Sequence, residues 1–476
     1  MSAVVETRPI TDRMRRIFAR QRAAFLADMN PSYAVRRERL DRLLAMTERH
    51  TDALIGAIGE DFGHRSRQET LLADVLTVIA AIKHARRHLK RWMKPRRAPT
   101  ALPYLPAHNR ILCQPLGVIG IVSSWNYPYQ LAVGPAVGAL AAGNRVMIKP
   151  SELTPRLAAL LAQVVAETFG EDELAVVTGD ASVGQAFVEL PFDHLLFTGS
   201  THVGRLVAQA AAKNLTPVTL ELGGKSPVIV DASADVRAIA PRVAYAKLLN
   251  AGQTCIAPDY ALVPAAKIEA FAEAIRRAAE RLYPEPLANP DYTSIVSERH
   301  YQRLRGLVED ARAKGGRVLE IGARSAAAAG RKFPPTLVLD AAAEMRVMQE
   351  EIFGPILPVV GYTTLDDALR FVNAGDRPLA LYWFGDDRAN RERVLRETIA
   401  GGVTVNDCLL HFAQEDLPFG GVGASGMGAY HGEHGFRTFS KEKPVTFQSR
   451  LNGMALIYPP YGRTFDRVAA LLKRLL

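Results

Sequence analysis

The sequence predicts an α/β fold with two parallel sheets, each covered by helices, and a small β arm outside them. The chain has 476 residues, enough for about three domains or two large ones. From Gly117, short β-rich runs alternate with helical segments, and the same alternation starts again at Pro227. Prolines interrupt any regular element between residues 95 and 115, which predicts an extended segment outside the core.

The first hundred residues are predicted to be helical. Apolar residues recur at three- and four-residue spacing from Leu40 to Ile58, with charged residues on the other face. A further helix is expected from about Glu69 to Trp92. It should end before Pro95, because the residue that precedes a proline disfavours the helical conformation.

Short apolar runs mark the strands of both sheets. The intervals between them are long enough for crossover helices, so the strands should be parallel. A domain boundary is expected near Gly223 and Gly224. The expected strands of the first sheet are Val118–Val122, Val146–Ile148, Ala175–Val177, Leu195–Phe197 and Val218–Leu220. Those of the second sheet are Pro227–Val230, Tyr260–Val263, Leu337–Leu339 and Gly402–Val405.

Composition is that of an ordinary globular protein. Apolar residues make up 48% and charged residues 23%, which excludes wholesale disorder and fibrous classes. The net charge is +10, but much of the basic excess lies on predicted helix faces, without the interleaved aromatic residues that stack on bases. We therefore expect no nucleic-acid partner.

Cysteine usage and hydropathy favour a cytoplasmic protein. Cys113, Cys255 and Cys408 lie far apart and match no disulfide or metal-ligand spacing, so no metal site is expected. No signal-peptide core is found near the N-terminus. The stretch from Ile111 to Asn144 carries no charge, but its prolines and polar residues argue against a transmembrane segment.

Three residues stand out as candidates for chemistry, and each also has an ordinary structural explanation. Cys255 lies in a loop of small and polar residues, where a thiol is accessible, although isolated cysteines are usually buried and inert. Glu221 ends a strand beside two glycines, which suits a general base or a structural salt bridge. Asn126 follows another strand and could donate to an oxyanion or shape a turn.

A phosphate-binding turn is also predicted. Residues 197–204 follow an expected strand and open an expected helix, whose free N–H groups favour an anion. By itself, a plain strand-to-helix turn explains this segment equally well. The glycine pattern between Gly421 and Gly426 lacks the strand and helix of a dinucleotide fingerprint, so we interpret it as a glycine-rich turn.

Together, these segments resemble the aldehyde dehydrogenase superfamily, in order and from Asp61 to Pro444. The resemblance depends on seven motifs: Ser124–Pro128, Lys149–Glu152, Phe197–Ser200, Glu221–Pro227, Gly252–Cys255, Glu350–Pro355 and Leu417–Gly421. The segments that begin at Cys255 and Gly423 look like the shorter, dimeric branch, which includes coniferyl aldehyde and fatty aldehyde dehydrogenases.

The resemblance implies oxidation of an aldehyde to a carboxylic acid. Cys255 would be the nucleophile, Asn126 and the Cys255 backbone N–H would hold the oxyanion, and Glu221 would activate the water that hydrolyses the thioester. NAD is the implied cofactor, with NADP as the alternative. The implied cofactor contacts are Trp125, Lys149, Glu152, Gly199, Ser200, Thr201, His202, Val203, Gly204, Glu351 and Phe353.

It also implies an organisation and partners. Residues 1–94 and 113–223 would bind NAD, 224–417 would form the catalytic domain, 95–112 and 440–450 would form an oligomerisation arm, and 451–476 a tail. A homodimer is expected. The amphipathic run Phe465 to Leu476 should pack on the body or the partner, with weak membrane contact as a second role.

The substrate and two alternatives stay open at this point. An aromatic, coniferyl-type aldehyde and a long-chain aliphatic aldehyde both fit, with Tyr127, His411 and Phe412 as candidates for the entrance. A CoA-acylating dehydrogenase would use the same thioester. A cysteine hydrolase or thioesterase would use Cys255 and Glu221 without redox chemistry, but it would leave the implied cofactor contacts without a purpose.

Overall fold

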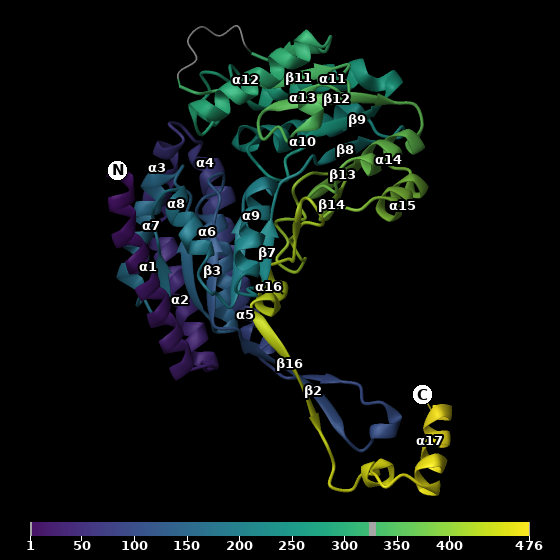
Figure 1. Ribbon diagram of the computed structural model, residues 1–476. Coiled ribbons are helices and arrows are strands. Elements are labelled where there is room, and N and C mark those ends of the chain that lie inside the picture. Colours follow the sequence, from purple (N-terminus) through teal and green to yellow (C-terminus); the bar gives the residue numbers. More distant parts are fainter. Residues whose placement is uncertain (1, 323–329, 476) are drawn as a thin grey trace.

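The N-terminal part of the chain is helical, as predicted (Figure 1). The computed structural model describes residues 2–322 and 330–475. The first helices are α1 (Ser2–Ala27), α2 (Tyr33–Arg49), α3 (Thr51–Asp61), α4 (Arg67–Thr70) and α5 (Thr77–Trp92). A π-helical turn, η1 (Leu71–Leu76), joins α4 to α5. The segment from Glu69 to Trp92, expected as one regular helix, is therefore helical throughout but contains a π turn. The 3.6-residue period of its apolar residues could not predict this turn.

The first sheet has six strands in the order β15-β7-β6-β3-β4-β5. The neighbours from β7 to β5 are parallel, and β15 is antiparallel to β7. The five strands predicted here are confirmed. Their bounds are β3 (Val118–Val122), β4 (Arg145–Lys149), β5 (Leu174–Val176), β6 (His194–Thr198) and β7 (Val218–Glu221), with β15 (Gly426–Met427) at the edge.

Helices cover both faces of this sheet, because alternate strand residues are apolar on each side. One face packs against α1, α8 (Ala181–Val188) and α9 (Thr201–Ala212). The other packs against α2, α5, α6 (Gln130–Ala142) and α7 (Pro155–Thr168). The N-cap of α7 is Thr154, followed by Pro155 at the first helical position, where its fixed backbone angle suits the helix.

The second sheet has seven strands in the order β10-β11-β12-β9-β8-β13-β14. All its neighbours are parallel except β10 and β11. Four of these strands were predicted, and β10, β12 and β13 were not. Strand β12 contains Pro358, and a proline argues against a central strand. The bounds are β8 (Pro227–Val230), β9 (Tyr260–Pro264), β10 (Arg317–Glu320), β11 (Thr336–Leu339), β12 (Ile356–Tyr362), β13 (Ala380–Phe384) and β14 (Gly402–Val405).

Helices cover the second sheet in the same way. On one face lie α10 (Val236–Leu248), α11 (Ile268–Leu282) and α12 (Glu298–Ala313), and on the other α14 (Leu365–Ala374) and α15 (Arg388–Glu397). Shorter segments complete this part: η3 (Leu249–Gly252), η4 (Ala265–Lys267) and α13 (Arg346–Gln349). The fold is thus α/β with two largely parallel sheets, as predicted.

A three-stranded antiparallel sheet forms an arm that extends away from both larger sheets (Figure 1). It contains β1 (Arg96–Ala98), β2 (His108–Pro115) and β16 (Ser440–Phe447). Strand β16 follows α16 (Gly432–Thr438) and pairs with β2 along its whole length. Strand β2 reaches Pro115, three residues beyond the expected end of the arm, because its pairing with β16 continues to Ser440.

The C-terminal tail returns to the arm. It contains η5 (Met454–Ile457) and α17 (Arg463–Leu475), and α17 contacts the turn η2 (Leu102–Tyr104). Phe465 and Val468 are half-buried, whereas Leu471 is exposed, so the expected apolar face is covered only in part. Leu476, the predicted end of this helix, lies outside the described residues. Among the helices that the structure describes, none is long and apolar enough to cross a membrane.

Candidate active site

The carboxyl ends of β3, β4, β6 and β7 meet at one edge of the first sheet, where parallel sheets commonly bind ligands. A cavity of about 780 Å³ lies there, between the first and second sheets. Eleven of the predicted site residues line it: Trp125, Asn126, Lys149, Glu152, Gly199, Ser200, Val203, Glu221, Cys255, Glu351 and Phe353. Residues that are up to 228 positions apart in the sequence therefore share one space.

Cys255 follows an unusual turn at the end of α10. Asn250 and Ala251 adopt left-handed backbone conformations, with φ of 52° and 51°. Gly252 has φ of 73°, and a Cβ there would lie 2.4 Å from the carbonyl oxygen of Gly354, so only glycine fits. The side chain of Gln253 then ties the turn to the neighbouring segment through the carbonyl of Ser294 and the N–H of Val296. This turn fixes the position of the thiol.

The thiol of Cys255 lies in a poor environment for negative charge. Burial, with the nearby carboxyl groups of Glu351 and Glu221 as smaller causes, raises the pKa of Cys255 to about 12. Burial, with Asp259 as a smaller cause, also raises the pKa of Glu351 to about 7. A raised pKa favours the neutral form of an acid, so the thiol is protonated at pH 7 and needs a base or a change in its surroundings to react.

Glu221 has an exposed fraction of only 3%, at the end of β7. Neither of its carboxyl oxygens has a hydrogen-bond partner among the described residues. Burial raises the pKa of Glu221 well above its usual range. A buried polar group without a partner is normally costly, so this carboxyl is suited to a proton exchange with a molecule that enters the cavity rather than to a structural ion pair.

Hydrogen bonds fix both the side-chain amide and the backbone carbonyl of Asn126. Its side-chain Nδ2 donates to the carbonyl of Gln253 over 3.1 Å, which leaves the second N–H of this amide for a ligand. Its backbone carbonyl accepts from the side chains of Arg65 and Asn250. An amide held in this way can stabilise an oxyanion that forms next to Cys255.

The predicted phosphate-binding turn is the N-terminus of α9. Ser200 is the N-cap and accepts from the N–H of Val203, and α9 has twelve residues, so its dipole favours an anion. Thr201, His202 and Gly204 do not line the cavity: the Thr201 hydroxyl donates to the carbonyl of Ala424, and Gly204 is buried against Leu222. His202 lies in the same turn of α9 without reaching the cavity.

Lys149 and Glu152 lie at the far end of the cavity. Lys149 is buried, its Nζ donates to the carbonyl of Pro150 over 2.8 Å, and it lies 3.6 Å from the carboxylate of Glu152. Burial lowers the pKa of Lys149. Glu152 itself is exposed, so its carboxylate can accept from sugar hydroxyls. These donor and acceptor groups, with the α9 N-terminus, fit a dinucleotide.

His300 and Arg303 also line this cavity and were not among the predicted site residues. His300 packs against Trp125, which also contacts the ring of Phe353. Arg303 donates to the carbonyls of Glu351 and Ile352 and thereby holds the segment that carries Glu351. Both lie on α12, whose amphipathic pattern is that of any surface helix, so the sequence offered no signal for them.

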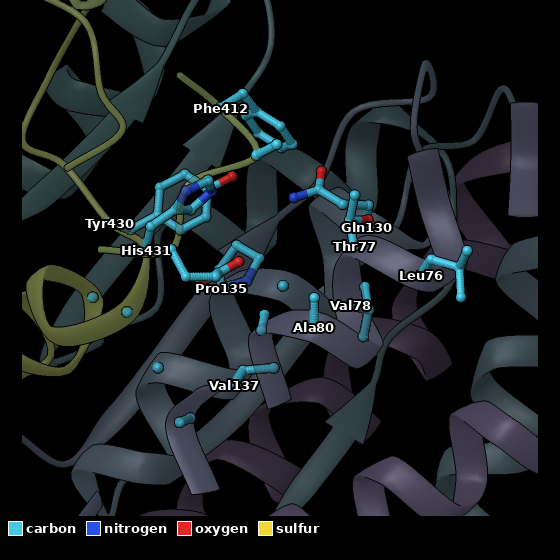
Figure 2. A pocket seen from close by; sticks show the side chains of 18 of the residues that line it. Leu76, Thr77, Val78, Ala80, Gln130, Pro135, Val137, Phe412, Tyr430 and His431 are labelled. Atoms are coloured by element: carbon cyan, nitrogen blue, oxygen red, sulfur yellow. The ribbon is translucent and has the colours of Figure 1, made fainter. Parts of the chain in front are cut away.

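A second, smaller cavity of about 210 Å³ lies between α5, α6 and the segment after β14. Figure 2 shows Phe412, Tyr430 and His431 on one side of it and Gln130 and Leu76 on the other. Burial raises the pKa of Tyr430 well above its usual range, and Glu221 and Cys255 are smaller causes of the same shift.

One of the three residues expected at the entrance lines the second cavity. That residue is Phe412. Tyr127 is buried, with its hydroxyl bonded to that of Thr254, and His411 is bonded to the hydroxyl of Thr404. Both rings pack inside the protein. An aromatic residue next to a site can form the wall of that site as readily as its opening.

A parallel α/β fold with a cysteine, an unpaired carboxyl and a helix N-terminus in one cavity fits an enzyme that uses the cysteine as a nucleophile beside a bound dinucleotide. The chain belongs to the aldehyde dehydrogenase family, whose model matches residues 11–445. A probable coniferyl aldehyde dehydrogenase of Pseudomonas aeruginosa is 51% identical over 96% of this chain and 95% of its own.

Solved structures agree with this assignment. Staphylococcus aureus AldH in its substrate-bound state superimposes with a TM-score of 0.91 at 38% identity, over 96% of this chain and 99% of its own. A Mycobacterium tuberculosis aldehyde dehydrogenase complexed with NAD⁺ has a TM-score of 0.80 at 29% identity, over 90% and 88%. The chain is therefore an enzyme that oxidises aldehydes to acids, and the hydrolase alternative has no support.

Proposed function

We propose that this enzyme oxidises a single-ring aromatic aldehyde through a thioester on Cys255, with NAD as the hydride acceptor. The observation that carries the proposal is the shared cavity, in which Cys255, Glu221 and Asn126 lie together with the residues that suit a dinucleotide. In this proposal residues 1–94 and 113–223 bind the cofactor, and residues 224–417 supply the nucleophile.

In the first half of the reaction, the sulfur of Cys255 bonds to the aldehyde carbon after the thiol loses its proton. The carbonyl oxygen becomes an oxyanion, which accepts from the free N–H of the Asn126 amide and from the backbone N–H of Cys255. A nicotinamide cofactor held beside Glu351 and Phe353 would supply the acceptor for the hydride of the same carbon. The carbon–oxygen double bond reforms, and the acyl group stays on the sulfur.

In the second half, Glu221 takes a proton from water, whose oxygen attacks the thioester carbon. The carbon–sulfur bond breaks, the carboxylic acid leaves, and Cys255 is free again. Burial raises the pKa of Glu221 above its usual range, and a more basic carboxylate takes a proton from water more readily. The same Asn126 amide holds the second oxyanion, so one site serves both halves.

Glu152 supports NAD over NADP as the cofactor. Its exposed carboxylate can accept from a ribose 2′-hydroxyl and would repel a 2′-phosphate. We expect a higher kcat/KM with NAD than with NADP, measured by absorbance at 340 nm. Glu152→Gln should lower the ratio of kcat/KM with NAD to kcat/KM with NADP by about tenfold. Equal or better efficiency of the wild type with NADP would contradict the assignment.

The second cavity supports the choice of substrate class. Its volume of about 210 Å³ is below the range typical of drug-sized ligands, and aromatic rings line it, which favours one ring over a long alkyl chain. The P. aeruginosa relative is named as a probable coniferyl aldehyde dehydrogenase. In a panel of cinnamyl-type, benzyl-type and long-chain aldehydes, we expect the cinnamyl-type to give the highest kcat/KM. A clear preference for long chains would refute this choice.

Filling the second cavity tests whether the aldehyde occupies it. Gly134 faces it from α6, and a Cβ there meets only the flexible end of Gln130, so Gly134→Phe can be built without backbone strain. We expect the KM for the aldehyde to rise about tenfold or more, with the KM for NAD unchanged. Gly56→Phe, at an exposed helix position with free space, is the matched control. An unchanged KM for the aldehyde would place the substrate elsewhere.

The arm supports a homodimer. Strands β1 and β16 are the edges of a three-stranded sheet, and an edge offers unpaired backbone groups to another chain. Exposed apolar side chains lie close by, at Leu105 and Phe447. Sedimentation at micromolar concentration should show twice the mass of one chain, and a monomer would contradict the proposal. A cytoplasmic location and weak membrane contact of α17 remain predictions.

A further inference from the structure

The segment from residue 65 to residue 74, which comprises the loop before α4, α4 itself and part of η1, carries three buried charged residues that have no role in the reaction described above. They are Arg65, Glu69 and Asp74, with exposed fractions of 5%, 8% and 0%. Charged residues are rarely buried unless they are paired. Their partners include backbone groups on the loops that carry Asn126 and Cys255.

Glu69 holds the turn that leads to Cys255. One oxygen of its carboxylate, Oε2, accepts from the backbone N–H of Asn250 over 3.0 Å and from the hydroxyl of Thr293 over 2.8 Å. The other, Oε1, accepts from the hydroxyl of Tyr283 over 3.0 Å. Asn250 is the first left-handed residue of the turn, a conformation that persists only where the surroundings hold it.

Asn250 passes this restraint to both reactive groups. Its side-chain Nδ2 donates to the carbonyl of Asn126 over 3.0 Å and to the carbonyl of Gln253 over 3.2 Å. The amide of Asn126 donates to the same Gln253 carbonyl. A continuous set of hydrogen bonds thus runs from Glu69 to the oxyanion donor and to a residue two positions before Cys255.

Arg65 and Asp74 hold the Asn126 loop from the other side. The Arg65 guanidinium donates to the carbonyl of Asn126 over 2.9 Å and pairs with Asp74 at 2.9 Å. Asp74 accepts from the backbone N–H groups of Tyr129 and Gln130, each over 3.1 Å. Arg65 and Asp74 therefore fix the backbone of Asn126 from the side of α4. Glu69 and Asn250 fix the same backbone relative to the turn that carries Cys255.

We propose that Glu69 is a positioning residue, which sets the distance between Cys255 and the Asn126 amide by holding Asn250 in its left-handed conformation. The proposal rests on the proposed roles of Cys255 and Asn126 and adds a residue that touches neither substrate nor cofactor. A carboxylate suits the task because it accepts three hydrogen bonds and donates none. Misplacement of reacting groups by about 1 Å can cost about 10²-fold in rate.

The test compares three variants of the full-length enzyme. Glu69→Ala removes all three acceptor contacts, and we expect kcat to fall by about 10- to 100-fold with the KM for NAD unchanged. Glu69→Gln should recover kcat to within about threefold of the wild type, because its oxygen can still accept from Asn250 and its amide can donate to Tyr283. Asn250→Gly permits the left-handed backbone but lacks the side-chain donors, so it should lose kcat as Glu69→Ala does.

Asp231→Ala is the matched control for a loss of stability alone. Asp231 is also buried and also accepts three hydrogen bonds, two from Ser233 and one from Asn390, but it lines neither cavity. Its variant should melt at a lower temperature and keep the wild-type kcat. The rate at which iodoacetamide alkylates Cys255 is the second readout, and at pH 8 it should change at least about threefold in Glu69→Ala but not in Asp231→Ala.

The outcomes separate this proposal from the proposed function. A wild-type kcat in Glu69→Ala or Asn250→Gly, or an equal loss in Asp231→Ala, overturns the positioning role. If Glu69→Ala does not fold, Asn250→Gly and Glu69→Gln decide the question. Cys255→Ala is measured in the same series: if it stays active, the proposed function itself fails, whatever the Glu69 variants do.

Discussion

Cys255→Ala should abolish NADH formation and the covalent labelling of the enzyme by its aldehyde. Without the sulfur no thioester can form, and hydride transfer has no tetrahedral intermediate from which to start. We expect kcat to fall by about 10⁴-fold or more. Absorbance at 340 nm and the mass of the intact protein after incubation with aldehyde and NAD measure the two effects.

Two controls make this result specific to Cys255. Cys113→Ala removes a half-buried thiol on the arm and should leave activity unchanged. In the wild type, alkylation by iodoacetamide should accelerate about tenfold per pH unit without a plateau up to pH 10, because the pKa of Cys255 is raised to about 12. Persistent NADH formation by Cys255→Ala would contradict the assignment of the nucleophile, and strong acceleration by CoA would identify an acylating dehydrogenase.

Glu221→Gln should stop the reaction halfway. The variant keeps the thiol and the oxyanion donor, so if Glu221 acts only on the later water, about one equivalent of NADH should appear per site before turnover stalls. The acyl group should then remain on Cys255, where the mass of the intact protein reveals it. The NADH burst in a rapid-mixing experiment and this mass shift are the two measurements.

Glu351→Gln is the matched control, since Glu351 is the other carboxyl close to Cys255 whose pKa is raised. It should raise the KM for NAD without trapping an acyl group. If Glu221→Gln shows neither a burst nor a trapped acyl group, the carboxyl is needed earlier, to take the proton of the thiol. Turnover at the wild-type rate would show that Glu221 is not the base.

Much of the fold could be predicted because buried parallel strands are continuous apolar runs. Strands β3 to β9 were found in this way, and the change of pattern near Gly223 separates the two larger sheets. The π-helical turn and β12 were not, because one depends on a single extra residue and the other contains Pro358. These features are set by tertiary contacts rather than by local periodicity.

The reactive residues could also be named from the sequence, but only as a set. Taken singly, Cys255, Glu221 and Asn126 each have an ordinary structural explanation. The order of the surrounding motifs favoured the catalytic explanation for all three. His300, Glu69 and Asp74 could not be named. They lie in helical segments where a polar residue normally faces water, and only the folded chain shows that these side chains face inward.

The pairing of β2 with β16 has a consequence for how the chain is made. Ser440 pairs with Pro115, so the two strands join positions 325 residues apart in the sequence. The edge strand β15 likewise joins β7 across about two hundred residues. During synthesis, β2 leaves the ribosome long before its partner and must wait while the second sheet is translated. The arm is thus the last sheet that can be completed, and an incomplete chain presents β2 as an unpaired edge to neighbouring nascent chains.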